Sequence, residues 1–170
     1  HEFRHGKANI KEQGIVDDNF NMQDGFGQNG YRNFSATLGI ENVVTGDYKS
    51  ALTNDSFLWS YGAGAGNMTS AGGIVSTNDF ATDTFHGVFT MLFGSYFGDY
   101  DFKDNLMRAS LASKGNLLSV SWSGRPHWHY HAMGLGAPLG YCARITQNNA
   151  KIGTKNQIMY AAGSSNGFNH

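Results

Sequence analysis

The chain has 170 residues, of which 40% are hydrophobic and 14% aromatic, and its formal net charge is −1 at pH 7. This length fits one domain with a substantial core rather than two domains. The sequence has no block of like charges, which excludes electrostatic binding to nucleic acid or to a membrane surface, since both need clustered Lys and Arg. The low charged fraction of 15% and the 23 glycines are typical of an extracellular or envelope protein.

Residues 14–122 predict strands that alternate with helices. Short apolar runs predict the strands, and apolar residues three or four positions apart predict the helices. The expected order is a strand over 14–16, a helix over 30–38, strand 41–44, helix 47–52, strand 57–61, strand 88–93, helix 103–112 and strand 117–122. Residues 68–83, between the strands expected over 57–61 and 88–93, are rich in Ser, Thr, Gly and Asp. This composition predicts a long excursion with one short helix near Asp79.

The two ends of the chain carry weaker signals. Residues 128–147 predict two short helices with a break near Gly134, Gly136 and Pro138, and residues 158–162 predict a last strand. Residues 1–13 are polar and basic, so we expect a peripheral arm or a truncated preceding element there, and a single domain over 14–170. The sequence shows neither a signal peptide nor an apolar run of membrane-spanning length, and we expect it to be part of a larger exported protein.

Two residue types bear on the chain's compartment. Cys142 is the single cysteine, which excludes an intramolecular disulfide, and its place in a predicted helix favours burial over catalysis. Asn33, Asn54 and Asn67 each begin an N-x-Ser/Thr triplet, which matters only in a glycosylating host.

Alternating strands and helices predict an α/β fold with a mostly parallel sheet and helices on both faces. Ligands and chemistry gather at the carboxyl ends of the strands in such sheets. We call this edge the carboxyl rim. Its expected members are Asp17-Asp18, Tyr61-Gly62, Gly94-Ser95 and Ser123-Gly124-Arg125.

A glycine-rich loop follows the strand FLWSY at this rim. Gly62, Gly64 and Gly66 alternate with alanines in the sequence FLWSYGAGAG. Such a turn either presents backbone N–H groups to a ligand or allows a tight turn that binds nothing. The sequence leaves both interpretations open.

A histidine cluster follows the last rim strand, in the order Arg125-Pro126-His127-Trp128-His129-Tyr130-His131. On a strand, His127, His129 and His131 would share one face and bind zinc or copper, and on a helix His127 and His131 would pair for the same purpose. No Glu completes an H-E-x-x-H frame. The alternative is a helix that starts at Pro126 and packs over the rim, with imidazole nitrogens bonded to backbone or to Asp17 and Asp18.

Ser95 is the candidate nucleophile of the rim. It would need a base from His127, His129 or His131, oriented by an acid such as Asp99 or, alternatively, Asp101 or Asp17. The alternative is that Ser95 is a small residue in a tight turn. Arg125 is expected to pair with Asp17, Asp18 or Asp99, or else to bind an anion. Aromatic residues near the rim offer surfaces for a sugar or a peptide, or else pack in the core: Tyr96, Phe97, Tyr100, Trp122 and Trp128.

Two of these turns together resemble the gingipain family of cysteine peptidases. That family carries a Gly-His-Gly turn that supplies the base and a Cys-x-x-Gly-Asp turn that supplies the nucleophile. The matching turns in this chain are Gly62-Ala63-Gly64 and Ser95-Tyr96-Phe97-Gly98-Asp99. The resemblance implies a caspase-like three-layer sandwich in which Ala63 stands at the base position and Ser95 at the nucleophile position.

The chain is also similar to a group of uncharacterised secreted Bacteroidota proteins over residues 14–149. These carry relatives of GLIDDNFG, LWSYGCGGG, FTMLFGSYFGDWD and GRPHWxxHHM, which this chain matches at residues 14–20, 58–66, 89–101 and 124–133. The similarity implies a domain of a multi-domain exported protein rather than a known activity.

Three functions follow as expectations. The first is a non-catalytic, peptidase-like domain of a secreted or cell-surface protein, with a binding, adhesion or assembly role and no cofactor. Its expected partners are other domains of the parent protein, or a cell-surface protein or glycan. The second is a hydrolase that uses Ser95 with a histidine, and the third is a metal-binding surface module.

Overall fold

The structure, a computed structural model, describes residues 6–21, 25–124 and 127–148. A parallel sheet forms its centre, with the strand order β10-β8-β3-β1-β2. The prediction of an α/β fold with a mostly parallel sheet is therefore confirmed. The strands are β1 (Gly14–Asp18), β2 (Val43–Thr45), β3 (Phe57–Ala63), β8 (Gly87–Phe93) and β10 (Ser119–Trp122).

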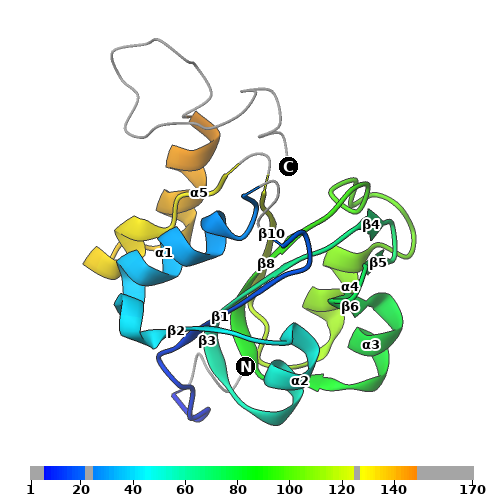
Figure 1. Ribbon diagram of the computed structural model, residues 1–170, viewed down its shortest axis with the longest axis horizontal. Helices are drawn as coiled ribbons and strands as arrows, with labels where there is room; N and C mark the ends of the chain where they lie inside the picture. Colours follow the sequence, from blue (N-terminus) through cyan, green and yellow to red (C-terminus); the bar gives the residue numbers. More distant parts are fainter. Residues whose placement is uncertain (1–5, 22–24, 125–126, 149–170) are drawn as a thin grey trace.

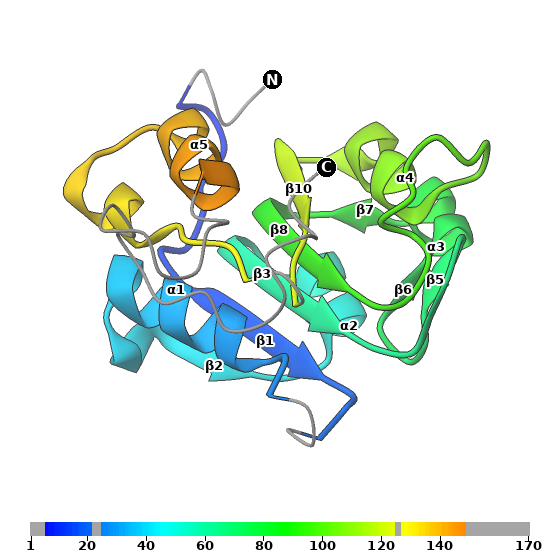
Figure 2. The same ribbon diagram turned by 90° about the horizontal axis from the view of Figure 1, so that it is seen from above.

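Helices cover both faces of this sheet, which makes three layers (Figure 1). Figure 2 shows α1 and α5 on one side of the strands and α2, α3 and α4 on the other. The helices are α1 (Gln28–Leu38), α2 (Tyr48–Asn54), α3 (Thr77–Thr82), α4 (Leu106–Ala112) and α5 (Leu139–Asn148).

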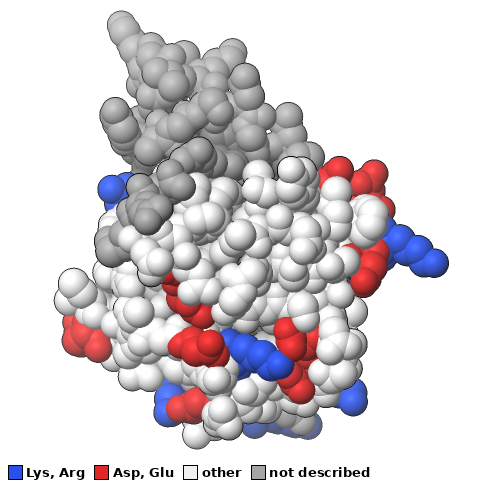
Figure 3. All heavy atoms as spheres, turned by 45° about the vertical axis from the view of Figure 1, so that its right-hand side comes forward, with Lys and Arg blue, Asp and Glu red and all other residues white. Residues whose placement is uncertain are grey.

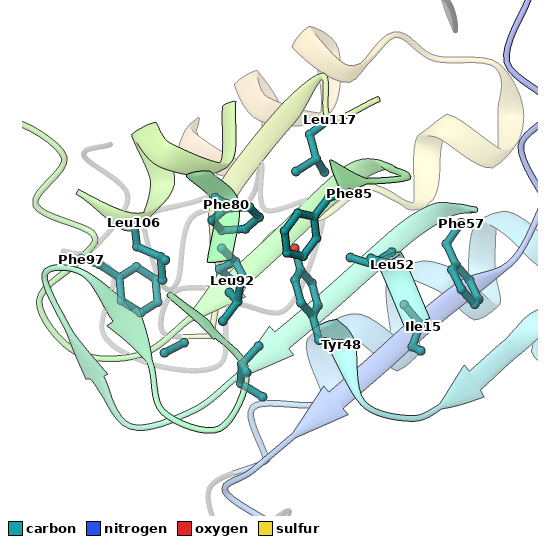
Figure 4. Close-up of a cluster of buried hydrophobic side chains, with 13 residues drawn as sticks. Ile15, Tyr48, Leu52, Phe57, Phe80, Phe85, Leu92, Phe97, Leu106 and Leu117 are labelled. Atoms are coloured by element: carbon teal, nitrogen blue, oxygen red, sulfur yellow. The ribbon is translucent and has the colours of Figure 1, made fainter. Parts of the chain in front are cut away.

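The two faces of the sheet have separate hydrophobic cores because neighbouring strand residues point to opposite faces. In β1, Ile15 belongs to the core that includes Tyr48 and Leu52 of α2. The next residue, Val16, belongs to the core that includes Phe34 of α1. Figure 4 shows the core on the α2 side, where aromatic and leucine side chains converge from the sheet and from three helices. Burying each such side chain contributes about 1.5–3 kcal/mol, before chain entropy is subtracted.

Side-chain caps set the starts of the helices on that face. Asp47 accepts a hydrogen bond from Ser50 N at the start of α2, and Ser76 and Asp79 form a reciprocal capping box at α3. The side chain of Asn105 accepts from the first turn of α4. The apolar spacing predicts a start at residue 103. The Asn105 cap explains why α4 instead begins at Leu106.

The remaining elements are short. The predicted excursion contains a small antiparallel sheet of β4 (Gly66–Asn67), β5 (Ser70–Ala71) and β6 (Val75–Ser76), followed by α3. A second small sheet pairs β7 (Thr84–Phe85) with β9 (Lys114–Gly115). Two 3₁₀ helices, η2 (Ile40–Asn42) and η3 (His131–Leu135), complete the described elements.

Besides the start of α4, several predicted boundaries are wrong, and the strand expected over 117–122 begins at Ser119. The strand expected over 41–44 begins at Val43, because η2 occupies the preceding residues. Residues 127–130 are not helical, so the first of the two helices expected over 128–147 is reduced to η3, and α5 is the second. The strand expected over 158–162 lies outside the described residues.

Acidic and basic side chains are interspersed on the face that Figure 3 shows, and no block of Lys and Arg forms there. In the described part of the chain, no helix combines the length and the apolar character needed to cross a lipid bilayer.

Candidate functional site

The carboxyl rim includes the point where the order of the strands along the sheet reverses. The chain passes from β1 to β2 on one side, and from β3 through β8 to β10 on the other, so the order reverses between β1 and β3. Asp17 lies opposite Gly62 and Asp18 opposite Ala63 in the register of these two strands. Open α/β sheets bind ligands at such a switch point, which makes this edge the first place to look for a site.

The two rim carboxylates accept hydrogen bonds from backbone N–H groups. Asp17 accepts from the N–H of Tyr48 at 2.8 Å. Asp18 accepts from Phe20 at 3.1 Å and from Gly27 at 3.2 Å. Burial raises the pKa of Asp17, against the opposing effect of the Tyr48 hydrogen bond. These carboxylates hold the connections into α1 and α2 in place.

Close backbone packing accounts for the glycine-rich loop. A Cβ at Gly62 would overlap Ile74, one at Gly64 would overlap the carbonyl oxygen of Gly72, and one at Gly66 would overlap the backbone of Ser95. The loop is thereby pressed against the β5–β6 connection and against the turn after β8. The glycines therefore allow the tight turn that the sequence offered as one of its two interpretations.

Ala63 is fully buried at the position that the gingipain resemblance assigns to the base. It belongs to the same core as Val16, Met91 and Phe93. Its carbonyl oxygen accepts a 2.8 Å hydrogen bond from Asn19 N. The methyl group at this position has no acid or base chemistry and contributes only to packing.

Ser95 is exposed at the start of the turn after β8. Its hydroxyl makes no hydrogen bond with any residue that the structure describes, and the three histidines of the cluster are among those residues. Its carbonyl oxygen accepts from Phe97 N at 3.0 Å, and Phe97 is fully buried. The residue between them, Tyr96, has a φ of 73° and is 67% exposed. Tyr96, Gly98, Asp99 and Trp122 line a hollow of about 150 Å³, and Ser95 is not among its lining residues.

The histidine cluster lies on the α1 face of the sheet, where residues 127–130 run beside α1 (Figure 2). Asn33 of α1 holds this segment. Its amide nitrogen donates to Trp128 O at 2.9 Å, and its amide oxygen accepts from Tyr130 N at 2.6 Å. From the other side, Thr146 of α5 accepts from His129 N at 3.1 Å. The segment is thus fixed between two helices and is not a strand of the sheet.

A pocket of about 300 Å³ lies between α1 and the histidine segment. We call it the histidine pocket. The α1 side contributes Asn29, Arg32, Asn33 and Ala36, and the other side contributes His127, Trp128, His129 and His131. The predicted cluster therefore does share one surface, but that surface faces α1.

Burial keeps two of these imidazoles neutral. Burial, followed by the charges of the neighbouring His131 and His127, lowers the pKa of His129 to about 4. The pKa of His127 is also lowered, first by burial and then by the charge of Arg32. Both rings are therefore uncharged near neutral pH, where each presents one N–H donor and one nitrogen acceptor.

The histidines do not converge on one point. The ring centroids of His129 and His131 are 6.5 Å apart in an edge-to-face arrangement. Over residues 6–21, 25–124 and 127–148, no three His, Cys, Asp or Glu side chains form a group that could hold a metal ion. The three-histidine zinc or copper site remains a sequence-based prediction without such a group among these residues.

Two other predictions can be placed. Arg125 and Pro126 lie outside the described residues, so the expected pairing of Arg125 with Asp17, Asp18 or Asp99 stays a prediction. Cys142 is fully buried in α5, as its place in a helix predicts, with its thiol directed at Tyr130 O.

No sequence motif points to Asn29 or Arg32, and Asn33 is part of a motif only through its glycosylation triplet. Asn29 and Asn33 are both buried, and they bond to each other one helical turn apart. The available signal is two amides at a spacing of four on the apolar side of an amphipathic helix, because buried amides need partners. Burial also removes Asn33 from use as a glycan acceptor in the folded chain.

Comparison with known proteins adds no relative: no protein-family model, no curated protein and no solved structure matches the chain. The gingipain resemblance therefore rests on the two rim turns and stays a prediction.

Proposed function

We propose that this chain is a non-catalytic binding domain of a secreted or cell-surface protein, built on a peptidase-like α/β fold. The observation that carries the proposal is the state of the two positions that a peptidase would use. Ala63 is buried in the core, and the Ser95 hydroxyl has no hydrogen bond to any described histidine. A nucleophile and a base that do not meet cannot perform acyl transfer.

The chemistry of serine gives this observation its weight. A serine hydroxyl is a weak nucleophile until a general base within hydrogen-bond reach removes its proton. Asn33 and Thr146 hold the backbone of the histidine segment against α1 and α5. Moving the backbone of residues 128–130 toward Ser95 would require these hydrogen bonds to break. The hydrolase reading therefore asks for a rearrangement of the α1 face.

Exposed aromatic side chains support a binding role for the turn that contains Ser95. Tyr96 is 67% exposed, Tyr100 is 53% exposed and Phe102 is 45% exposed. Aromatic rings on a surface turn stack on sugars and pack against protein partners. The proposed partners are therefore a glycan, a cell-surface protein or another domain of the parent protein.

Labelling with a serine-directed fluorophosphonate tests this proposal. The expected result is no specific label on the native chain and an unchanged background in Ser95→Ala. Ser50→Ala, at an exposed serine in α2, is the matched control, and an active serine hydrolase confirms that the probe works. Label that appears on the native chain and on Ser50→Ala but disappears in Ser95→Ala would contradict the proposed non-catalytic function.

A further inference from the structure

The histidine pocket has the size and the construction of a small-molecule site. Its volume of about 300 Å³ lies at the lower end of the roughly 300–1,000 Å³ typical of pockets that hold small organic ligands. It is distinct from the rim turn that carries Ser95, because residues of α1 and of the segment 127–131 line it. The binding surface named in the proposed function does not include this pocket.

One wall of this pocket is fixed before any ligand arrives. Asn33 bonds to the backbone of the histidine segment on both sides of His129. The indole N–H of Trp128 donates to Trp122 O at 3.0 Å, and the Trp128 ring stacks on Tyr130 with a centroid distance of 5.5 Å. A pre-organised wall lowers the entropy cost of binding.

The charge in the pocket has one sign. Arg32 is exposed at the pocket and makes no ion pair or hydrogen bond with any described residue. The other titratable groups that line the pocket are His127, His129 and His131, and no carboxylate lies among the lining residues. α5, which packs behind His129, contributes the uncharged hydroxyl of Thr146. A guanidinium that has no counter-ion within the described part of the chain is suited to a two-point contact with a carboxylate.

The remaining wall is apolar. Trp128 and Ala36 present ring and methyl surface to the pocket, and the neutral imidazoles of His127 and His129 add the surface of two flat rings. A ligand that uses both kinds of surface has a carboxylate at one end and a flat apolar body at the other.

We infer that the histidine pocket binds an organic carboxylate, with its acid group on Arg32 and its apolar body against Trp128. This inference deepens the proposed binding function and rests on it. A bound anion raises the pKa of the imidazoles beside it, so binding takes up protons. By linkage, affinity rises as the pH falls.

Calorimetric titration with benzoate tests the inference, because benzoate joins a carboxylate to a flat apolar ring. We expect saturable binding that tightens as the pH falls from 6.5 toward about 4, the range in which a bound anion favours protonation of His129. Arg32→Gln should weaken it about tenfold, the effect of losing one charge-assisted contact. Arg108→Gln, at an exposed arginine in α4 on the other face, should leave it unchanged. Benzyl alcohol, which lacks the charge, should bind about tenfold more weakly than benzoate.

Three results would overturn the inference: no heat of binding up to about 10 mM benzoate, equal affinity in Arg32→Gln and Arg108→Gln, or equal affinity for benzyl alcohol. Circular dichroism of both arginine variants shows that they are folded. The outcome is separate from that of the fluorophosphonate test. Labelling of Ser95 would reject the non-catalytic function while benzoate still bound, and absence of benzoate binding would reject the pocket while Ser95 stayed unlabelled.

Discussion

Asn33 accepts a 2.6 Å hydrogen bond from the backbone N–H of Tyr130, which lies 97 positions later in the chain. The same amide donates to the carbonyl of Trp128 at 2.9 Å. One side chain therefore satisfies an acceptor and a donor two residues apart, as a neighbouring strand would in a β-ladder. This contact joins α1 to the histidine segment and forms the back of the histidine pocket.

Asn33→Ala should lower the free energy of unfolding by about 2–3 kcal/mol, because it leaves buried backbone groups of residues 128 and 130 without partners. Urea denaturation measures the change. Asn54→Ala is the control, since Asn54 is exposed and bonds only within its own helix; it should change stability by less than about 0.5 kcal/mol. Equal effects of the two variants would contradict a structural role for the Asn33 bridge.

Gly62→Ala should destabilise the fold by about 1–3 kcal/mol, because a Cβ there overlaps Ile74 on the crowded side of β3. Gly140→Ala serves as the comparison. Gly140 is in α5 with open space around it, so alanine there should stabilise the chain by up to about 1 kcal/mol. Thermal unfolding of both variants measures the difference, and a Gly62→Ala variant as stable as the native chain would refute close packing of the loop.

The pH dependence of stability should carry the signature of His129. Its pKa falls from 6.5 to about 4 on folding, mainly through burial, so the unfolded chain binds more protons between these two values. The contribution of neutral His129 to the free energy of unfolding is therefore fully present above pH 6.5, and it falls as the pH drops toward 4. His129→Gln should flatten the stability curve in this window, whereas His86→Gln, at a histidine outside the pocket, should not. An unchanged slope in His129→Gln would show that the window belongs to other groups.

Tyr96→Gly should stabilise the folded chain by about 1 kcal/mol, because a φ of 73° is unfavourable for tyrosine and open to glycine. Phe102→Gly, at another exposed aromatic of the same turn, should not stabilise, since Phe102 is not among the residues with positive φ. Chemical denaturation compares the two. If Tyr96→Gly also weakens binding to a glycan or protein partner, the exposed ring takes part in recognition.

Local patterns predicted most of the elements because the causes of those elements are local. The run VFTMLF is apolar except for Thr90 and forms most of β8, a buried central strand. Tyr31, Phe34 and Leu38 have helical spacing and lie in α1, which Gly39 ends. The boundaries that differ are those where a cap or a 3₁₀ turn decides the start, as Asn105 does for α4.

The histidine segment shows where local patterns mislead. Pro126 and the apolar spacing after it predict a helix from residue 128. Residues 127–130 are instead non-helical, and their backbone forms hydrogen bonds with the side chains of Asn33 and Thr146. These partners come from α1 and α5, so no pattern within the segment contains them. His127, His129 and His131 line one pocket although the segment is not a strand, and that pocket faces a helix and an arginine that no motif indicates.

The alternation of strands and helices, the burial of Cys142 and the crowding of glycines after β3 can be predicted from local sequence, because periodicity, hydrophobicity and the lack of a Cβ act over a few residues. Which faces of these elements meet depends on the complete fold. Asn33 reaches Tyr130 across 97 positions, and Arg32 lies beside His127. Such contacts follow from strand order and layer packing, which place distant segments together. The pocket between α1 and the histidine segment is therefore a product of the fold.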